Sequence, residues 1–381
     1  MYLILVCASV RASFAASPPV PTGLSVNQLD QLLTRLYGQN DGKIARRIAG
    51  VHLTERADAA LIAKWQAHLA GDRSRKALMA VADASAFLAP PAPEILSQAP
   101  PDAETRKQIL ARTWDYVREA LPRFPDFFAD RTTSSFAFTT DSFLHPLDVL
   151  RNPYGTEQNL RFMHEVLGPG RSSDSLEPQL FYLGSSTEEV TYRGGIEVAN
   201  SAHAATSSPA TQIQMNTSGE FGPILGLILS DISLDQMVWS HWERGLNGAL
   251  AVFSYSVPSE KSHFAVTFTD GPAEVPAYHG EIAVDPASGV IWHVTLLAMT
   301  SGVGLFRESS MLVEFASVEI GGKAYVCPVR SVAMNRYFDT FEYANTAHTP
   351  IPFATSINDV SFTHYHLFRS QTHIITGATE R

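Results

Sequence analysis

The C-terminal part of the chain, from Met237 onward, is built of short strand-like segments joined by turns too short to hold a crossover helix. Between Tyr278–Val284 and Val290–Leu296 lies Asp285-Pro-Ala-Ser-Gly289, where proline presets a turn and glycine can take a left-handed conformation. A second hairpin is predicted at Gly321-Gly322, a typical two-residue turn. Consecutive hairpins place neighbouring strands antiparallel, so the pattern predicts a meander.

The other predicted strands share an alternation of apolar and polar residues, which is typical of a sheet with two different faces. They are Thr133–Thr139, Leu180–Leu183, Val190–Val198, Leu250–Val257, Phe264–Phe268, Met311–Ile320, Ala324–Val332, Val360–Arg369 and Thr372–Ile375. Between them, Asn152–Glu177 and Ala202–Ala210 read as loops. The sheet domain is expected to span 131–376.

The N-terminal part has a different period, with apolar residues at helical spacing from Leu24 to about Leu121. Ser25 and Gln28 form a candidate capping box for the first helix, and Gly38 a candidate stop. Three more helices are expected, over Thr54–Ala70, Ser74–Leu88 and Asp102–Pro122. We therefore expect a helical module over 24–122, ahead of the sheet.

The segment Phe221–Ile232 is strongly apolar and contains Pro223, which suits the first turn of a helix better than a central strand. This favours a short helix lying across the concave side of the sheet, with a buried strand as the alternative. The expected fold class is α+β: a helical module followed by a large curved antiparallel sheet, a half-barrel-like meander that encloses a short helix.

The first residues predict export. An apolar stretch is followed by Ser13-Phe-Ala15, a small-x-small cleavage pattern, so 1–16 reads as a signal peptide that lacks a basic start. The expected location is the periplasm or the exterior. No later apolar run reaches the roughly 20 residues of a membrane span. The net charge of −10 comes without any run of basic residues, which argues against nucleic acid as a partner.

The sequence contains no motif for a catalytic centre or cofactor: no phosphate loop, no Gly-x-Gly-x-x-Gly, no Gly-x-Ser-x-Gly and no His-Glu-x-x-His. We expect no cofactor. His364 and His366 are weak metal candidates, because residues two apart on a strand point to one face; His241, His279 and Glu281 are possible further ligands.

Cysteine chemistry gives no function either. Cys7 lies in the expected signal, which leaves Cys327 without an intramolecular disulfide partner. The apolar run around it predicts a buried, unreactive thiol.

Aromatic residues suggest a binding surface. Trp239, Phe253, Tyr255 and Trp292 are candidates to line an apolar pocket, with ordinary core packing as the alternative. In a regular strand only one of Trp239 and Trp242 would face the interior. The pairs Glu188 with Glu189 and Asp270 with Glu274 read as surface charge.

Four sequence segments together resemble a family of exported bacterial proteins of uncharacterised function. They are Trp239-Ser-His-Trp-Glu243, Tyr278-His-Gly-Glu281 with Asp285-Pro-x-x-Gly289, Tyr325-Val-Cys-Pro-Val-Arg-Ser331 and Phe362-Thr-x-Tyr-His-x-Phe368. The resemblance covers the chain from about Leu24 and implies no catalytic residues. More remotely, the expected fold is similar to the half-barrel of periplasmic lipoprotein carriers and related sensors, which implies a cradle for an acyl chain or apolar peptide.

Three functions follow as hypotheses. The first is an exported binding, carrier or sensor-like protein for an apolar small molecule, lipid or peptide. The second is an exported hydrolase, with or without the help of a metal ion at His364 and His366. The third is a structural or interaction module of the cell envelope. The sequence does not give the oligomeric state.

Overall fold

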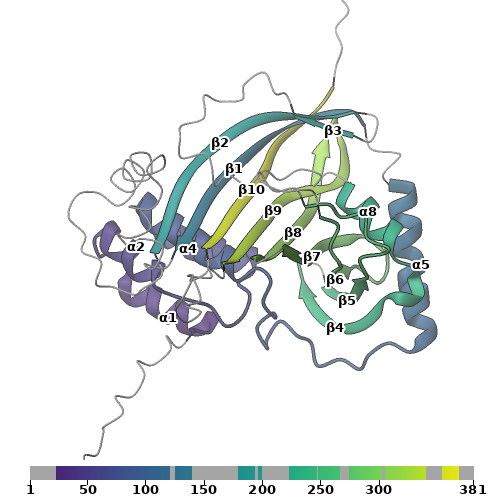
Figure 1. Cartoon of the computed structure of the whole chain (residues 1–381), viewed down its shortest axis with the longest axis horizontal. Coiled ribbons are helices and arrows are strands. Elements are labelled where there is room, and N and C mark those ends of the chain that lie inside the picture. The colour runs from purple at the N-terminus through teal and green to yellow at the C-terminus, as the bar shows by residue number, and fades with distance from the viewer. Residues whose placement is uncertain are drawn as a thin grey trace, which may run out of the picture.

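The computed structural model describes residues 23–120, 125–139, 179–193, 196–199, 223–246, 248–266, 274–302, 305–339 and 354–368. Within these ranges the protein has the expected α+β fold, a helical N-terminal region followed by one large antiparallel sheet that is not closed. Figure 1 shows the helical region at one end of the molecule, with the curved sheet rising from it.

The helical region consists of α1 (Val26–Leu36), α2 (Asp41–Ala49), α3 (Ala59–His68) and α4 (Asp72–Ala84). The capping box of Ser25 and Gln28 is confirmed, and Gly38 follows α1 with φ +82°. The four helices bury a core of their own, in which Leu29, Ile48 and Trp65 are fully inaccessible to solvent. The indole Nε1 of Trp65 donates to the Asp30 carboxylate at 2.6 Å, so this large buried side chain has its polar atom satisfied.

Ten strands form the sheet, in the order β3-β2-β1-β10-β9-β8-β7-β6-β5-β4. The strands are β1 (Phe127–Thr139), β2 (Gln179–Arg193), β3 (Ile196–Ala199), β4 (Val238–Gly245), β5 (Gly248–Val257), β6 (Tyr278–Val284), β7 (Ile291–Gly302), β8 (Leu305–Ile320), β9 (Lys323–Asp339) and β10 (Ala354–Leu367). From β4 to β10 every neighbour in the chain is a neighbour in the sheet, so the predicted meander is confirmed. The exception is β1, which pairs with β10, the last described strand.

Both predicted hairpin turns are present. At the β6–β7 turn Gly289 has φ +77°, and its N–H donates to the Asp285 carbonyl at 2.9 Å. At the β8–β9 turn Gly321 and Gly322 have φ +61° and +81°, a pair of left-handed conformations that two-residue hairpins require. These turns fix the register of the strands that flank them.

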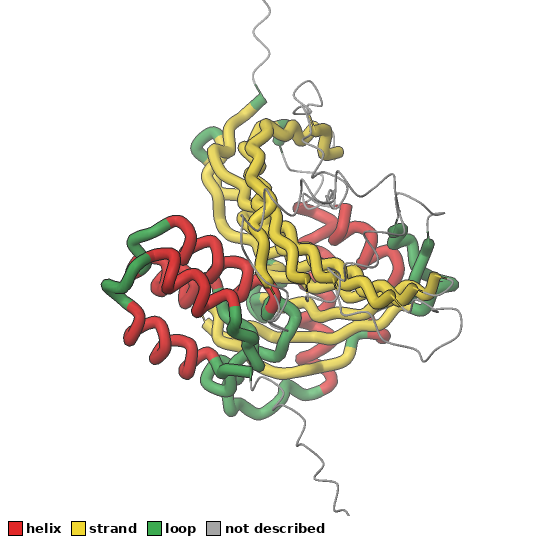
Figure 2. Tube along the Cα trace, turned by 60° about the vertical axis from the view of Figure 1, so that its left-hand side comes forward, coloured by secondary structure: helices red, strands yellow, loops and turns green. Residues whose placement is uncertain are grey.

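The two faces of the sheet carry different helices, as neighbouring residues of β8 show. Val313 packs into a cluster with α5 (Ala103–Ala120) and α8 (Pro223–Asp231), whereas Leu312 packs into a cluster with α4. Successive strand residues point to opposite faces, so α5 and α8 cover one face and α4 the other. We call these the inner and the outer face. Figure 2 shows the bent sheet with helices on both sides.

The outer face meets α4 at a buried charge cluster. The Arg330 guanidinium hydrogen-bonds to Asp83 at the end of α4, forms an ion pair with Glu314 at 2.8 Å and lies 3.4 Å from Asp359. The side chain of Asp83 is fully inaccessible and those of Arg330 and Asp359 are 15% and 6% exposed. Burial first, and the Asp359 charge second, raise the pKa of Asp83 well above its ordinary value. We call these four residues the Arg330 cluster.

A second ionic contact joins the helical region to β4. Arg56 pairs with Glu243 at 2.7 Å, and both side chains are largely buried. Burial alone would raise the pKa of the Glu243 carboxyl, but the hydrogen bond from His241 and the charges of His293 and Arg56 lower it to about 2. This glutamate is therefore ionised in the folded protein.

The linker between α4 and α5 lies along the free side of β4. Leu96 donates its N–H to the Trp242 carbonyl at 2.9 Å, and Arg244 donates to the Glu94 carbonyl at 2.8 Å. The indole of Trp242 donates to the Ala99 carbonyl, also at 2.9 Å. The linker thus pairs with backbone groups that an edge strand would otherwise expose.

Several predictions about the helices need correction. Asp41–Ala49, not predicted, is helical: it has only two buried apolar residues, Ile44 and Ile48, and a weak pattern for that reason. The helix predicted over Thr54–Ala70 starts later, because Asp58 caps it by accepting from the Leu61 N–H. The helix predicted over Asp102–Pro122 is α5, which packs on the inner face and not in the core of α1–α4.

Some of the predicted strands and loops are confirmed, and others lie outside the described residues. Leu180–Leu183 and most of Val190–Val198 belong to β2 and β3, while the short helix predicted within Phe221–Ile232 is confirmed as α8. Other predictions lie outside the described residues: the signal over 1–16, Asn152–Glu177, Ala202–Ala210, Phe268, Asp270 and Thr372–Ile375.

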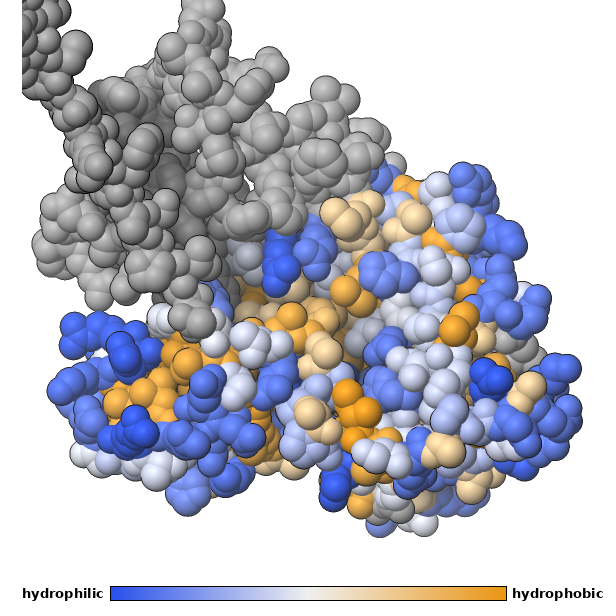
Figure 3. Space-filling view, turned by 90° about the horizontal axis from the view of Figure 1, so that it is seen from below, coloured by the Kyte–Doolittle hydropathy of each residue, from blue (hydrophilic) through white to orange (hydrophobic). Residues whose placement is uncertain are grey.

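The described residues contain no helix whose length and apolar character would allow it to cross a bilayer. In the coloured part of the face seen from below, most side chains are hydrophilic and hydrophobic ones gather over the helical region (Figure 3).

Candidate functional site

Asp231 is the residue that sets the candidate site apart. It ends α8, where a negative charge meets the negative end of the helix dipole, and its side chain is inaccessible to solvent although it lies near the molecular surface. A carboxylate in this position is unfavourable unless several donors surround it. The sequence Leu-Ile-Leu-Ser-Asp brings the carboxylate here at the end of an otherwise apolar helix.

Four donors surround this carboxylate. Tyr278 on β6 donates its hydroxyl at 2.8 Å, and His263, in the loop after β5, donates its backbone N–H at 2.9 Å. The Nδ1 of the same histidine makes a short contact with the carboxylate, and Ser230 donates at 3.3 Å. Burial would raise the pKa of Asp231, but the hydrogen bonds from His263 and Tyr278 outweigh it and the pKa is lowered.

The negative charge of Asp231 also changes the pKa of Tyr278. Burial, the hydrogen bond to Asp231 and its negative charge all raise the pKa of the phenol. The hydroxyl therefore stays protonated and donates. Its ring lies 6.1 Å from that of Tyr255 in an edge-on arrangement, and both rings belong to the inner apolar cluster.

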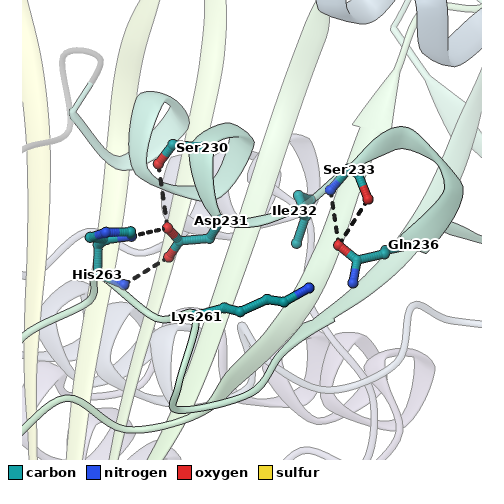
Figure 4. Close-up of a pocket in the computed structure, with 7 residues that line it drawn as sticks. All are labelled: Ser230, Asp231, Ile232, Ser233, Gln236, Lys261 and His263. Carbon is teal, nitrogen blue, oxygen red and sulfur yellow. Dashed lines mark hydrogen bonds and ion pairs between the residues drawn. The ribbon is translucent and has the colours of Figure 1, made fainter.

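A pocket of about 340 Å³ opens beside this carboxylate, at the end of α8 (Figure 4). The residues that line it come from the end of α8, the turn that follows and the loop after β5: Ser230, Asp231, Ile232, Ser233, Gln236, Lys261 and His263. In Figure 4 the Lys261 side chain extends across the pocket, between His263 and Gln236. The His263 side chain is 74% exposed, so the ring nitrogen that does not face Asp231 is open to solvent.

Turn geometry fixes the remaining polar groups. Ser233 donates its backbone N–H and its hydroxyl to Gln236 Oε1, at 3.0 and 3.1 Å, which holds the turn between α8 and β4. The amide nitrogen of Gln236 is the part of this side chain that remains for a ligand. The Lys261 N–H closes the turn after β5 on the Pro258 carbonyl at 3.0 Å.

The aromatic residues expected to line a pocket lie elsewhere. Trp239, Phe253 and Tyr255 come together in the inner apolar cluster, with the Trp239 and Phe253 rings 5.5 Å apart. Trp292 is separate and packs against Leu250, Val252 and Ala283. The interior that the first three form is filled by side chains of α5 and α8.

The expectation for Trp242 is wrong. Both Trp239 and Trp242 pack on the inner cluster, with ring centroids 4.9 Å apart. The register of β4 shifts between Trp239 and His241, and this bulge changes the alternation that a regular strand would have.

The weak metal candidates lie at the end of β10. His364 has φ +52°, and its Nδ1 lies 2.9 Å from an Asp130 carboxylate oxygen; the His366 ring stacks on Phe128. Within the described ranges no group of three or more His, Cys, Asp or Glu side chains could hold a metal ion. His241 contacts Glu243, and Glu281 accepts from Ser240.

Two further predictions can be compared with the structure. Cys327 is fully buried, and burial raises its pKa to about 12, which agrees with an unreactive thiol. Glu188 pairs with Arg131 on the neighbouring strand at 3.1 Å, so this residue is part of an ion pair.

Sequence reasoning missed the pocket. Asp231 and His263 are 32 residues apart, and Asp231 and Tyr278 are 47 apart, so no local motif joins them. The one available signal was a carboxylate inside the apolar run Phe221–Ile232, because an ionisable group next to a buried helix requires partners.

No family model, no curated protein and no solved structure matches this chain. The sequence resemblance to exported bacterial proteins, and the remote one to lipoprotein carriers, therefore stay predictions.

Proposed function

We propose that the protein is an exported binding or carrier protein whose inner face takes an apolar or lipidic ligand. The observation that supports this proposal best is the character of α8. Its apolar residues point in all directions: Ile224, Leu225, Ile228 and the following Ile232 are buried in the inner cluster, and Leu227 and Leu229 pack against it while partly exposed. A helix that is apolar all round is stable only inside an apolar environment.

The way α8 is held also favours a ligand site. A helix of nine residues is too short to be stable alone, so α8 depends on its packing. Its side-chain hydrogen bonds to other described elements converge on Asp231, at one end. A ligand that makes the same apolar contacts can therefore displace α8 from the sheet, while the hydrogen bonds of Asp231 keep the C-terminal end of the helix in position.

The surface beneath α8 suits such a ligand. Phe253, Tyr255 and Tyr278 are almost completely buried there, and Trp239 is half-buried beside them. Apolar pockets with a few fixed polar groups are the usual form of small-molecule sites. Export is part of the proposal and depends on the cleavage pattern within 1–16.

The test uses the uncharged fluorophore N-phenyl-1-naphthylamine, whose emission rises in apolar surroundings. We expect saturable binding, displaced by dodecyl maltoside below its micellar concentration. Hydrogen exchange with and without this detergent should change in α8 and β5 to β7 but not in α1 to α3. Absence of saturable binding, or an exchange change confined to the helical region, would contradict the proposal.

A matched pair of variants separates binding from stability. Ile228 on α8 and Ile48 on α2 are both fully buried, so Ile228→Ala and Ile48→Ala remove the same groups from two different cores. Each substitution should cost about 2–5 kcal/mol of stability. Only Ile228→Ala should change the affinity for the fluorophore; an equal effect of Ile48→Ala would show that the fluorophore reports on unfolding.

A further inference from the structure

The polar atoms of the pocket are divided unequally between acceptors and donors. Both oxygens of Asp231 accept hydrogen bonds from Ser230, His263 and Tyr278, and Oε1 of Gln236 accepts two from Ser233. These side-chain acceptors are therefore used within the fold. The Gln236 amide nitrogen and the Lys261 ammonium are left facing the pocket, and both are donors only.

Lys261 carries a positive charge at the pocket, whereas the carboxylate of Asp231 is inaccessible to solvent and accepts four hydrogen bonds. Among the residues that the structure describes, none makes a hydrogen bond or ion pair with its ammonium. A competing anion is Asp235, an exposed residue of the turn between α8 and β4 whose charge interacts with that of Lys261. Its pKa is lowered by hydrogen bonds from Ser233 and its own backbone, and by the Lys261 charge. Nδ1 of His263 faces Asp231, so its Nε2 is an acceptor in the neutral ring and a donor in the charged ring.

The pocket adjoins the apolar interior. Ile232 lines the pocket and belongs to the inner cluster, where it is 4% exposed. Tyr278, which binds Asp231, contacts Tyr255 on one side and Phe264 on the other, with ring centroids 6.1 and 6.0 Å away. One ligand could thus place a polar end among the donors and an apolar end beneath α8.

We propose that this pocket binds the anionic headgroup, a carboxylate or a phosphate monoester, of a single-chain amphiphile whose tail occupies the inner apolar face. The inference rests on the proposed function, since it names the ligand class for the same site. The donors of Gln236 and Lys261 favour an acceptor-rich group, and the ammonium of Lys261 favours a negative one.

The experiment compares ligands that share a dodecyl chain and differ in the headgroup: dodecanoate, dodecyl phosphate, dodecyl maltoside and dodecyltrimethylammonium. Each displaces N-phenyl-1-naphthylamine from the full-length protein below its micellar concentration. Acetate and inorganic phosphate are added as headgroups without a tail. We expect the two anionic amphiphiles to bind about five to ten times more tightly than the maltoside, as for one charge-assisted contact near the surface.

Three variants test the named residues. Lys261→Met should abolish the preference for anions and leave the maltoside unchanged. Asp235→Asn, which removes the competing carboxylate, should strengthen anion binding about twofold to threefold, the size of a weak surface charge effect. Lys43→Met, an exposed lysine on α2, is the control and should change nothing.

The outcomes separate the two proposals. If all four amphiphiles bind equally, or Lys261→Met keeps the preference, the headgroup site is wrong but the apolar site stands. If none of them displaces the fluorophore, the proposed function fails. If inorganic phosphate or acetate binds as tightly as its dodecyl counterpart, the pocket holds a free anion and the amphiphile assignment is overturned. A tighter dodecanoate than dodecyl phosphate, or the reverse, identifies the headgroup.

Discussion

Replacing Arg330 by methionine should destabilise the protein strongly, and more so at high pH. Its guanidinium is the single cation of the Arg330 cluster, facing the carboxyl groups of Asp83, Glu314 and Asp359. Removing one partner of a buried ion pair typically costs about 3–5 kcal/mol, because the remaining charges stay desolvated. We expect a loss of this size at pH 8.

The pH dependence follows from the carboxyl groups. Burial is the main cause that raises the pKa of Asp83, and the charge of Asp359 adds to it. Burial also raises the pKa of Asp359, with a further contribution from Glu314. The charge of Arg330 opposes the rise in both groups. An acid with a raised pKa in the folded state stabilises it fully below the ordinary pKa and loses this contribution as the pH rises through the folded value. Without Arg330 both values rise further, at about 1.4 kcal/mol for each pKa unit. The cost of Arg330→Met should thus be smaller at pH 5 than at pH 8.

The assay is urea unfolding at 25 °C, followed by tryptophan fluorescence at both pH values. Arg336→Met is the matched control: the residue lies on the same strand, 3.3 Å from Glu308, but its side chain is 37% exposed. Its loss should cost at most about 1 kcal/mol, as for a surface pair. Equal costs for the two variants, or a cost of Arg330→Met that does not change with pH, would refute the reasoning.

Two further outcomes are expected. A Cβ at Gly280 would lie 1.9 Å from the Thr295 carbonyl oxygen, so Gly280→Ala should lower the free energy of unfolding in urea by about 1–3 kcal/mol. A Cβ at Gly226 would have no atom within 4 Å, so Gly226→Ala should leave that free energy unchanged. Equal effects of the two substitutions would contradict this reasoning. Burial first, and the nearby Asp58 carboxylate second, raise the pKa of Glu94 to about 7. The stability that Glu94 contributes below pH 4.5 is therefore lost as the pH rises through 7. Glu94→Gln should remove this pH dependence of the melting temperature between pH 4.5 and 7. An unchanged slope would show that Glu94 is not the titrating group.

The hairpins could be predicted because their determinants are local. Proline and glycine at 285–289, and the glycine pair at 321–322, fix turns that need no knowledge of distant residues. The helix α8 could also be predicted, from Pro223 and an apolar run of limited length. The pairing of β1 with β10 could not, because it joins the first and the last of the described strands along the chain.

The candidate site lay beyond sequence reasoning for the same reason. Tyr278 and His263 read as ordinary strand and loop residues until Asp231 is placed between them. The two tryptophans of β4 show a different limit. A regular strand would place only one of Trp239 and Trp242 on the inner face, but a bulge between them brings both indoles to that face. Periodicity predicts the side of a strand only as far as the next irregularity.

The path of the linker connects the two faces of the sheet. The chain leaves the outer face at the end of α4, pairs with the free side of β4 through Glu94 and Leu96, and reaches the inner face as α5. This pairing protects an edge of an open sheet from other chains. It also ties α5, which shares the inner cluster with α8, to the helical region on the opposite face. Glu94 lies in this linker, and burial raises its pKa to about 7, so we expect its ionisation to weaken the attachment of the inner helices as the pH rises through that value.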